Sequence, residues 1–405
     1  NTGKLDEAQK SYEGSLALSR EIQNRRGIAD ALINLGVLHG DGRGDHEAAL
    51  NRYREALQTV RDLGDKNSEA LVLNNIGNIS LNRAQFEEAR TYFERALTLH
   101  EQIQVPGPLA DTLHNLGVTA ANAGDFDGAV RYYLRALENR RKAGRGPGEA
   151  IELYSIGMQY EYQGQLGKAI ESHEAALKKL EEIGETGFWL AAILAQHASA
   201  LSQVGRAAEA QPLLEKALSA AQGAGPQFLI ALIATVQGDS FFFQGDYAQA
   251  RSHYTRALQA AKPAGNRYLL PARAGLAKVA TASGNSRAAV QDLRQLVRDL
   301  DANGLKYLAV ECSVYLGEAL LKTGSAAPAR KELEDALRAS ERFGLRVLQA
   351  RSHALLARAM NETGDAAGAH LHSEQARQLL QQIRQETGAD TILKRSDLAS
   401  VLPPS

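Results

Sequence analysis

The stretch LGVTAANAGDFDGAVRYYLRAL, residues 116–137, holds one copy of a pattern that recurs along the chain. Its landmarks are a leading Leu-Gly pair, a glycine at 124, Ala129, Tyr133 and Ala136. Offsets of four and then three residues place Ala129, Tyr133 and Ala136 on one face of an α-helix. We therefore interpret the stretch as two helices joined by a tight turn at Gly124.

This turn position recurs with a period of about forty residues along the chain. The residues that occupy it are Gly3, Gly44, Ala84, Gly124, Gly164, Gly205, Gly245, Gly284, Gly324 and Gly364. Alanine stands five residues after each of them, from Ala8 to Ala369. Such regular self-similarity indicates an array of stacked repeats rather than several unrelated domains.

A small residue also precedes most turns by seven positions, usually after leucine or isoleucine. The residues concerned are Gly77, Gly117, Gly157, Ala198, Gly238, Ala277, Gly317 and Ala357, with Gly36 one residue further back. Glycine inside a helix costs about 1 kcal/mol relative to alanine, so its recurrence predicts a contact that needs the space. The first helix of each repeat, helix A, is therefore expected to pack closely against the second, helix B.

Capping residues mark the helix ends. Glycines that can close helix B in the left-handed conformation are Gly64, Gly144, Gly184, Gly225, Gly265, Gly304 and Gly344. Aspartates that can cap the start of helix B are Asp45, Asp125, Asp246 and Asp365. Because no segment alternates with the period of a β-strand, the pattern predicts an all-α protein.

Composition excludes several classes of function. The 405 residues carry 46 basic and 47 acidic side chains, and this balance gives no electrostatic reason to expect direct nucleic-acid binding. Cys312 is the only cysteine, which excludes an internal disulfide and a cysteine-based zinc cage. No apolar run has the length that a membrane-spanning helix needs, so we expect no membrane contact from this chain.

The combined pattern of small residue, turn glycine, alanine, aromatic and alanine resembles the tetratricopeptide repeat, or TPR. The usual TPR period is about thirty-four residues. The longer unit found here is similar to the repeats of kinesin light chains, of spindle-orientation adaptors and of TPR arms in bacterial signalling proteins. The resemblance implies a right-handed α-solenoid of about nine and a half forty-residue helix-turn-helix repeats, with the A helices lining a concave groove.

This register divides the chain into residues 1–386, the solenoid, and residues 387–405, a C-terminal tail. Within the solenoid we expect a partial first repeat over residues 1–25 and nine full repeats over 26–386. The missing initiator methionine and the start in mid-repeat lead us to expect a fragment of a longer protein. Whether the tail, which ends in two prolines before Ser405, is ordered is left open.

Asparagines cluster on the A helices of the first three full repeats. Asn34, Asn75 and Asn115 share the position two before the small residue, Asn78 follows that residue, and Asn82 and Asn122 share the position five after it. In TPR proteins these positions face the groove, and an amide can both donate to and accept from a peptide backbone. The resemblance therefore implies a peptide-binding site at these asparagines, flanked by His114 and Tyr154, although solvated helical asparagines are an alternative.

The later repeats differ at the position two before the small residue, where Val236, Gly275, Tyr315 and Leu355 stand. Residues 241–243 are three consecutive phenylalanines, of which we expect at least one in the core. The groove is therefore expected to be polar in its first half and more apolar in its second.

Catalytic and metal-binding patterns are absent from the sequence. The run Gly40-Asp41-Gly42-Arg43-Gly44 loosely resembles a phosphate loop, but it occupies a repeat turn and follows no strand. His370 and His372 are two apart on a predicted helix and point to different faces, which argues against a metal pair. We expect no enzyme activity, no metal and no cofactor.

The leading hypothesis is a non-catalytic protein- or peptide-binding scaffold, or a sensor module, belonging to a larger bacterial signalling protein. Two alternatives remain open: a receptor for a small peptide or small molecule that changes the compactness of the superhelix, and a self-association module. We expect a cytoplasmic location. The identity of the partner and the oligomeric state do not follow from the sequence.

Overall fold

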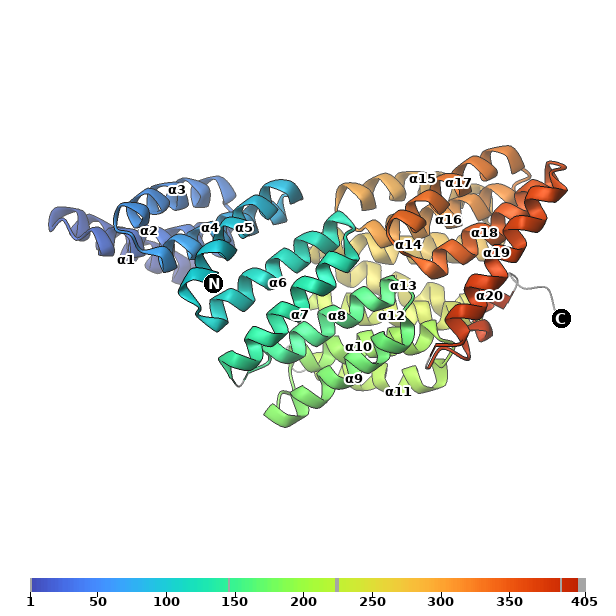
Figure 1. The fold of residues 1–405 in the computed structure, drawn as a ribbon, viewed down its shortest axis with the longest axis horizontal. Coiled ribbons are helices and arrows are strands. Elements are labelled where there is room, and N and C mark those ends of the chain that lie inside the picture. Colours follow the sequence, from blue (N-terminus) through green and yellow to red (C-terminus); the bar gives the residue numbers. More distant parts are fainter. Residues whose placement is uncertain (1, 145, 223–225, 387, 400–405) are drawn as a thin grey trace. The chain divides into compact units, whose positions relative to one another are not determined.

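The computed structural model describes residues 2–144, 146–222, 226–386 and 388–399. Within these ranges the chain consists of helices and turns without a β-strand, as Figure 1 shows. The all-α solenoid fold is therefore confirmed. None of the described helices is long and apolar enough to cross a lipid bilayer.

The residues divide into two compact units. Unit 1 comprises residues 1–123 and 131–144, and unit 2 comprises residues 124–130 and 145–405, so that the helix α7 (Phe126–Ala143) belongs partly to each. The other helices of unit 1 are α1 (Thr2–Glu21), α2 (Arg25–Val37), η1 (Leu38–Gly42), α3 (His46–Asp62), α4 (Lys66–Asn82), α5 (Phe86–Ile103) and α6 (Pro106–Ala123).

Unit 2 continues the same alternation of A and B helices. Its A helices are α8 (Gly148–Tyr162), α10 (Phe188–Gln203), α12 (Gln227–Gln244), α14 (Asn266–Ala282), α16 (Lys306–Lys322) and α18 (Arg346–Glu362). Its B helices are α9 (Leu166–Ile183), α11 (Ala207–Gln222), α13 (Tyr247–Ala261), α15 (Ser286–Ala302), α17 (Ala326–Arg342) and α19 (Ala366–Arg384). Short elements are η2 (Lys262–Ala264), η3 (Ile392–Lys394) and α20 (Ser396–Ala399).

The expected turn chemistry is present at most positions. Positive φ angles occur at the A–B turn residues from Gly44 to Gly364 and at six of the predicted helix B caps, Gly64, Gly144, Gly184, Gly265, Gly304 and Gly344. The predicted cap Gly225 lies outside the described residues, whereas Gly3, predicted as a turn, lies within α1. Each of the four predicted aspartate caps accepts a hydrogen bond from the backbone N–H three residues ahead.

The extra residue between the first full A and B helices is accommodated in the helix itself. Residues 38–42 form a π-helical turn that continues α2, where the wider winding absorbs one additional residue. The run 40–44 is thus a lengthened helix end, and it has the geometry of a repeat junction.

The helix A glycines are explained by the aromatic position of helix B. A Cβ atom placed on Gly77 would lie 2.6 Å from the ring of Phe93, and one on Gly238 would lie 2.6 Å from the ring of Tyr254. Real Cβ atoms do not approach ring carbons so closely. The ring therefore fits only because glycine has no side chain and leaves a notch in the surface of helix A. This contact locks the two helices of a hairpin together and confirms the predicted close packing.

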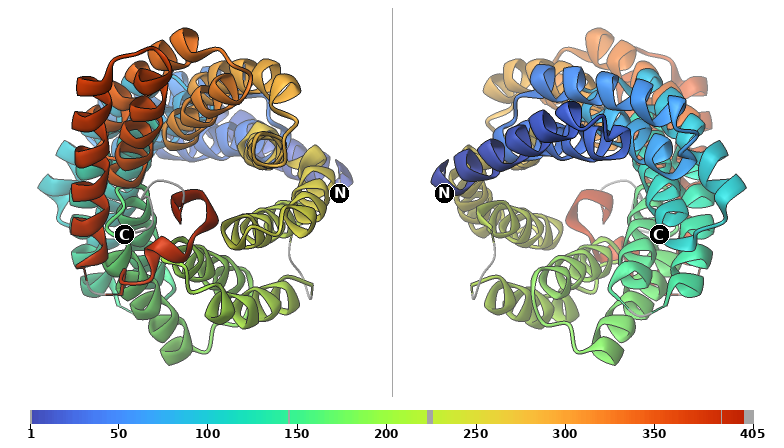
Figure 2. Two further views of the ribbon diagram at one scale, coloured as in Figure 1. Left: turned by 90° about the vertical axis from the view of Figure 1, so that its right-hand side faces the viewer. Right: turned by 90° about the vertical axis from the view of Figure 1, so that its left-hand side faces the viewer.

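Unit 2 curves so far that its late repeats contact its early ones. Gly164, at the end of α8, lies against Val347 of α18, and Leu166 and Val347 belong to one hydrophobic core. The rings of Phe126 and Phe343 meet at an angle of 72° with centroids 6.3 Å apart. The A helices from α8 to α18 therefore line a common inner side of unit 2 (Figure 2).

The C-terminal tail is folded over residues 388–399. This segment follows α19 and turns inward, where η3 and α20 lie on the inner side of unit 2, drawn in red in Figure 2. Ala389, Ile392 and Leu398 are fully buried there. The segment lies outside the repeats, as the sequence indicates, but it is part of the packed structure.

Candidate ligand-binding site

The interior of unit 2 contains a pocket with a cavity volume of about 250 Å³. Its walls come from five successive A helices, α8, α10, α12, α14 and α16, or from residues just before them. The position directly after the small residue contributes Met158, Ser199, Asp239 and Lys278, and the position five after it contributes Tyr162, Gln203 and Phe243. These are the repeat positions expected to face the groove.

One wall of the pocket is a continuous row of aromatic rings. Phe188, Phe228 and Tyr268 stand forty residues apart near the beginnings of α10, α12 and α14. The ring centroids of Phe188 and Phe228 are 5.7 Å apart, and those of Phe228 and Tyr268 are 4.9 Å apart. Trp189 extends the row toward Tyr154, with centroids 6.4 Å apart. All of these side chains are only partly buried, so the row presents an apolar surface to a ligand.

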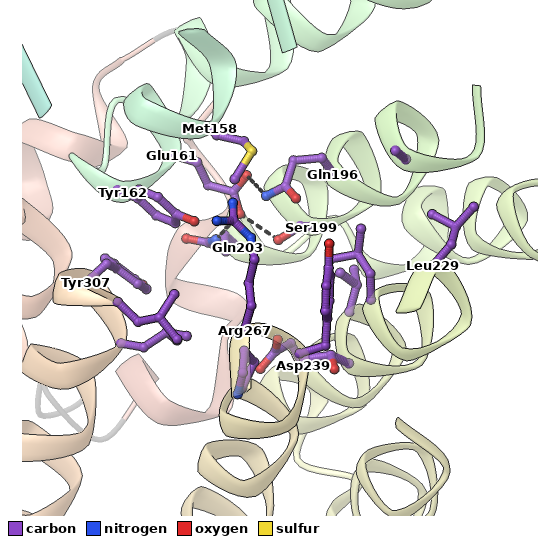
Figure 3. Close-up of a pocket in the computed structure, with 18 of the residues that line it drawn as sticks. Met158, Glu161, Tyr162, Gln196, Ser199, Gln203, Leu229, Asp239, Arg267 and Tyr307 are labelled. Carbon is purple, nitrogen blue, oxygen red and sulfur yellow. Dashed lines mark hydrogen bonds between the residues drawn. The ribbon is translucent and has the colours of Figure 1, made fainter. Parts of the chain in front are cut away.

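A carboxylate held by neutral donors also lines the pocket. Glu161 accepts hydrogen bonds from Gln196 Nε2 at 2.8 Å, from Ser199 Oγ at 2.6 Å and from Gln203 Nε2. Figure 3 shows the three donors converging on Glu161 from α10. His173, which takes the aromatic position of its repeat, lies behind it with Nε2 3.8 Å from the carboxylate.

Arg267 contributes a positive charge to the lining of the pocket. Its exposed side chain extends from α14 toward the Glu161 end of the pocket (Figure 3). Burial and the charge of Glu161 raise the pKa of Tyr162 to about 12, and the charge of Arg267 opposes that shift. Glu161 and Arg267 therefore offer an acceptor and a cation to the same small volume.

A second charged cluster closes the floor. Lys278 Nζ lies 2.8 Å from Asp239 Oδ1 and 3.3 Å from Glu311 Oε2, and the Tyr254 hydroxyl donates to Asp239 at 2.6 Å. Burial alone would lower the pKa of Lys278, but Asp239 and Glu311 outweigh it and hold the pKa well above its ordinary value. The ammonium is thus paired with two carboxylates of the protein itself.

Of the residues predicted from the sequence, only Tyr154 lines this pocket. The asparagines lie in unit 1: Asn34 and Asn82 are exposed, and Asn78 and Asn122 are partly buried. Asn75 lies beside the Tyr53 side chain, and Asn115 Nδ2 lies 3.3 Å from Asn74 Oδ1. The ring of His114 packs on Tyr133 with centroids 5.4 Å apart. Binding at these residues therefore remains a prediction.

Two signals in the sequence could have indicated the pocket. Gln196 occupies the same repeat position as Asn75 and Asn115, so an amide returns at this position in α10 after Ser155 in α8. The aromatics Phe188 and Phe228 recur with the repeat period just before the helix A core. What the sequence does not reveal is which repeats bring these positions together around one cavity.

The family comparison agrees with the repeat pattern of the chain. The model of the MalT-like TPR region matches residues 77–384, and a general tetratricopeptide repeat model matches residues 1–62. The chain belongs to the MalT-like TPR region family. No curated protein matches the sequence of this MalT-like TPR region at a significant level.

Solved structures share the fold of the MalT-like TPR region at low identity. A Rap protein in complex with competence and sporulation factor matches with a TM-score of 0.62 and 16% identity, over 91% of this chain and 99% of that one. The apo form of the quorum sensor NprR from B. thuringiensis matches with a TM-score of 0.54 and 15% identity, over 90% and 99%. Apo RapI matches with a TM-score of 0.51 and 13% identity, over 76% and 99%.

Proposed function

We propose that this chain is a non-catalytic sensor module of a signalling protein and that the pocket of unit 2 binds a short extended peptide. The observation that carries the proposal is the joint presence of an aromatic row and the Glu161–Gln196–Ser199–Gln203 cluster on consecutive A helices. The aromatic row suits apolar side chains, while amides and hydroxyls suit a peptide backbone.

The structural neighbours support the same reading. One of them is a Rap protein solved with competence and sporulation factor, and another is a quorum sensor, and both match over most of their length. A chain with this fold and a polar-aromatic inner pocket is suited to respond to a ligand from outside its own polypeptide.

The charges indicate what the ligand presents. Lys278 is already paired with Asp239 and Glu311, so it is not free to bind an anion. Glu161, by contrast, is held by uncharged donors, and Arg267 extends toward the same end of the pocket. We infer a ligand with a hydrogen-bond donor or a positive group for Glu161 and a carboxylate for Arg267, which a peptide backbone with a free end provides.

The test is selection of peptides from a displayed library of random heptapeptides on the full chain. Selected peptides should bind in solution, and Phe228→Ala or Gln196→Ala should weaken their binding by about tenfold or more. Leu371→Ala is the matched control, because Leu371 is 57% exposed on α19 and does not line the pocket. Peptides that bind all three variants as well as the parent would place the site elsewhere.

The asparagines of unit 1 remain a separate proposed peptide-binding surface. The double variant Asn75→Ala, Asn115→Ala tests it with the same selected peptides. Weaker binding at an unchanged melting temperature would support a groove role. A lowered melting temperature with unchanged binding would assign the two amides to the contacts they make with Tyr53 and Asn74.

A small molecule is the second candidate ligand, because a cavity of about 250 Å³ is small for a peptide of several residues. Solution scattering separates the candidates: the receptor hypothesis expects the chain to become more compact on addition of the ligand, whereas a passive scaffold keeps its radius of gyration. Light scattering at increasing protein concentration tests the third hypothesis, self-association.

A further inference from the structure

The segment 388–399 supplies hydrogen bonds to the ends of two A helices. Thr391 Oγ1 donates to the carbonyl of Val204 at 2.6 Å, and Ser396 Oγ donates to the carbonyl of Phe242 at 2.9 Å. Arg395 Nη1 lies 3.4 Å from the carbonyl of Gln203. The last carbonyls of a helix lack partners within it and favour a cation nearby, so the segment adds donors at the ends of α10 and α12, where the Phe242 carbonyl also accepts from the Gly245 N–H at 3.0 Å.

A buried ion cluster fixes the segment to α18. Asp397 Oδ2 lies 2.8 Å from Arg395 Nη2 and 3.4 Å from Arg351 Nη1. Burial works against the charged form, but the two guanidinium groups lower the pKa of Asp397 to about 2. Arg351 also contacts Glu318 at 3.1 Å. Asp397 is thus paired with one guanidinium from the segment and one from α18, and Glu318 pairs with both Arg351 and Lys322.

The segment also buries three apolar anchors and leaves three residues exposed. Ala389, Ile392 and Leu398 have no exposed surface, whereas Asp390, Lys394 and Ala399 are exposed. Anchors separated by polar residues, together with hydrogen bonds to carbonyls, are the means by which grooves recognise short peptides. The inner face of unit 2 thus holds this part of its own chain as it would hold a peptide.

The repeats themselves do not depend on the segment for their hairpin packing. In a solenoid each repeat is stabilised by its neighbours, and here the glycine–aromatic contacts join helices A and B without any residue of 388–399. Arg395 does reach the pocket wall, with its guanidinium carbon 3.9 Å from the centre of the Phe243 ring. The surface covered by the segment therefore adjoins the pocket through Phe243.

We propose that residues 388–399 are a built-in ligand on a second peptide-binding surface of unit 2, and that a partner segment of the same chemistry displaces them. Such a partner presents an isoleucine or leucine, then an arginine and an aspartate two residues apart, and a leucine directly after the aspartate. The surface that receives it consists of the ends of α10 and α12 and the Arg351–Glu318 pair of α18 and α16. The proposal stands independently of the function proposed for the pocket.

The first experiment uses a chain that ends at Glu386 and a synthetic peptide of residues 388–399. We expect the peptide to bind this chain with one-to-one stoichiometry in calorimetry. Its affinity for the full chain should be lower by a factor of at least about ten. A peptide with Asp397→Ala should lose about tenfold in affinity or more, whereas the matched peptide with Lys394→Ala should keep its affinity. Equal binding to both chains, or no binding to a folded shortened chain, overturns the proposal.

The second experiment keeps every repeat and does not depend on the folding of the shortened chain. Hydrogen exchange of the parent chain should show the amides of 388–399 opening at least about tenfold more often than those of α12. The full chain with Asp397→Ala and Leu398→Ala should then bind the synthetic peptide, while Lys394→Ala should not. Exchange of the segment only together with α12 overturns the proposal and makes the segment an integral part of the fold. Either result leaves the peptide selection at the pocket unaffected.

Discussion

The ring of Tyr162 stacks on the ring of Tyr307, with centroids 4.8 Å apart and planes inclined by 20°. Tyr162 belongs to α8 and Tyr307 to α16, which are separated by several repeats along the chain. Both side chains line the pocket. The stack therefore joins the two sides of the cavity and helps to set its width.

Replacement of Tyr307 by alanine should remove this contact. We expect Tyr307→Ala to reduce the free energy of unfolding by about 1–3 kcal/mol, since it deletes a partly buried ring and its aromatic partner contact. Tyr307→Phe keeps the stacked ring and should change stability by less than about 1 kcal/mol. Urea denaturation measures both variants, and an equal loss in the two would show that the hydroxyl rather than the stack matters.

The glycine notches predict opposite effects for two Gly→Ala substitutions. Gly77→Ala should destabilise the chain by about 1–3 kcal/mol, because the new methyl group would overlap the ring of Phe93. Gly14→Ala should stabilise it by about 0.5–1 kcal/mol, because Gly14 lies inside α1 with nothing within 4 Å of its added Cβ. Thermal unfolding of the two variants checks the signs. If both melting temperatures shift in the same direction, the proposed packing of Phe93 against Gly77 is contradicted.

Glu161→Gln tests the carboxylate end of the pocket. The substitution keeps the shape but turns one acceptor oxygen into a donor, which then faces either the amide of Gln196 or the donors of Ser199 and Gln203. We expect a loss of about 1–3 kcal/mol in the free energy of unfolding, together with weaker binding of the selected peptides. The matched control is Glu182→Gln on α9, an exposed carboxylate outside the pocket, which should change neither quantity. Unchanged peptide binding by Glu161→Gln would exclude the carboxylate from recognition.

Buried histidines predict an acid-sensitive fold. Burial lowers the pKa of His197 and of His353 to about 4, and the neighbouring His372 contributes to the shift of His353. The unfolded chain therefore binds more protons than the folded chain between pH values of about 6.5 and 4. The free energy of unfolding therefore has its full value above a pH of about 6.5. It decreases as the pH falls toward about 4, by on the order of 3 kcal/mol for each histidine.

The measurement is the melting temperature of the parent chain and of His353→Gln across this pH range. The parent should melt progressively lower on acidification, and the variant should show a shallower dependence because one buried histidine is missing. His370→Gln, which alters an exposed histidine of α19, is the matched control and should follow the parent. A parent melting temperature that does not change with pH in this range would contradict the prediction.

Local features of the fold could be predicted from the sequence because they depend on residues close together in the chain. The turn at Gly124, the cap at Asp125 and the packing of Gly117 against Tyr133 all lie within a single repeat. Helical periodicity and capping chemistry act over four to seven residues. The repeat therefore specifies its own hairpin, and the groove-facing positions within each A helix follow from it.

The identity of the site depended on the tertiary structure. The contact between Thr391 and Val204 joins residues 187 positions apart, and neither residue carries a signal in the repeat. Such contacts arise because small rotations from one repeat to the next accumulate along a solenoid, until α18 returns to the end of α8. The sequence by itself determined the helices, turns and inward-facing positions of this protein. Only the accumulated curvature decided that Tyr154, Glu161 and Arg267 share a pocket and that residues 388–399 fill the space beside it.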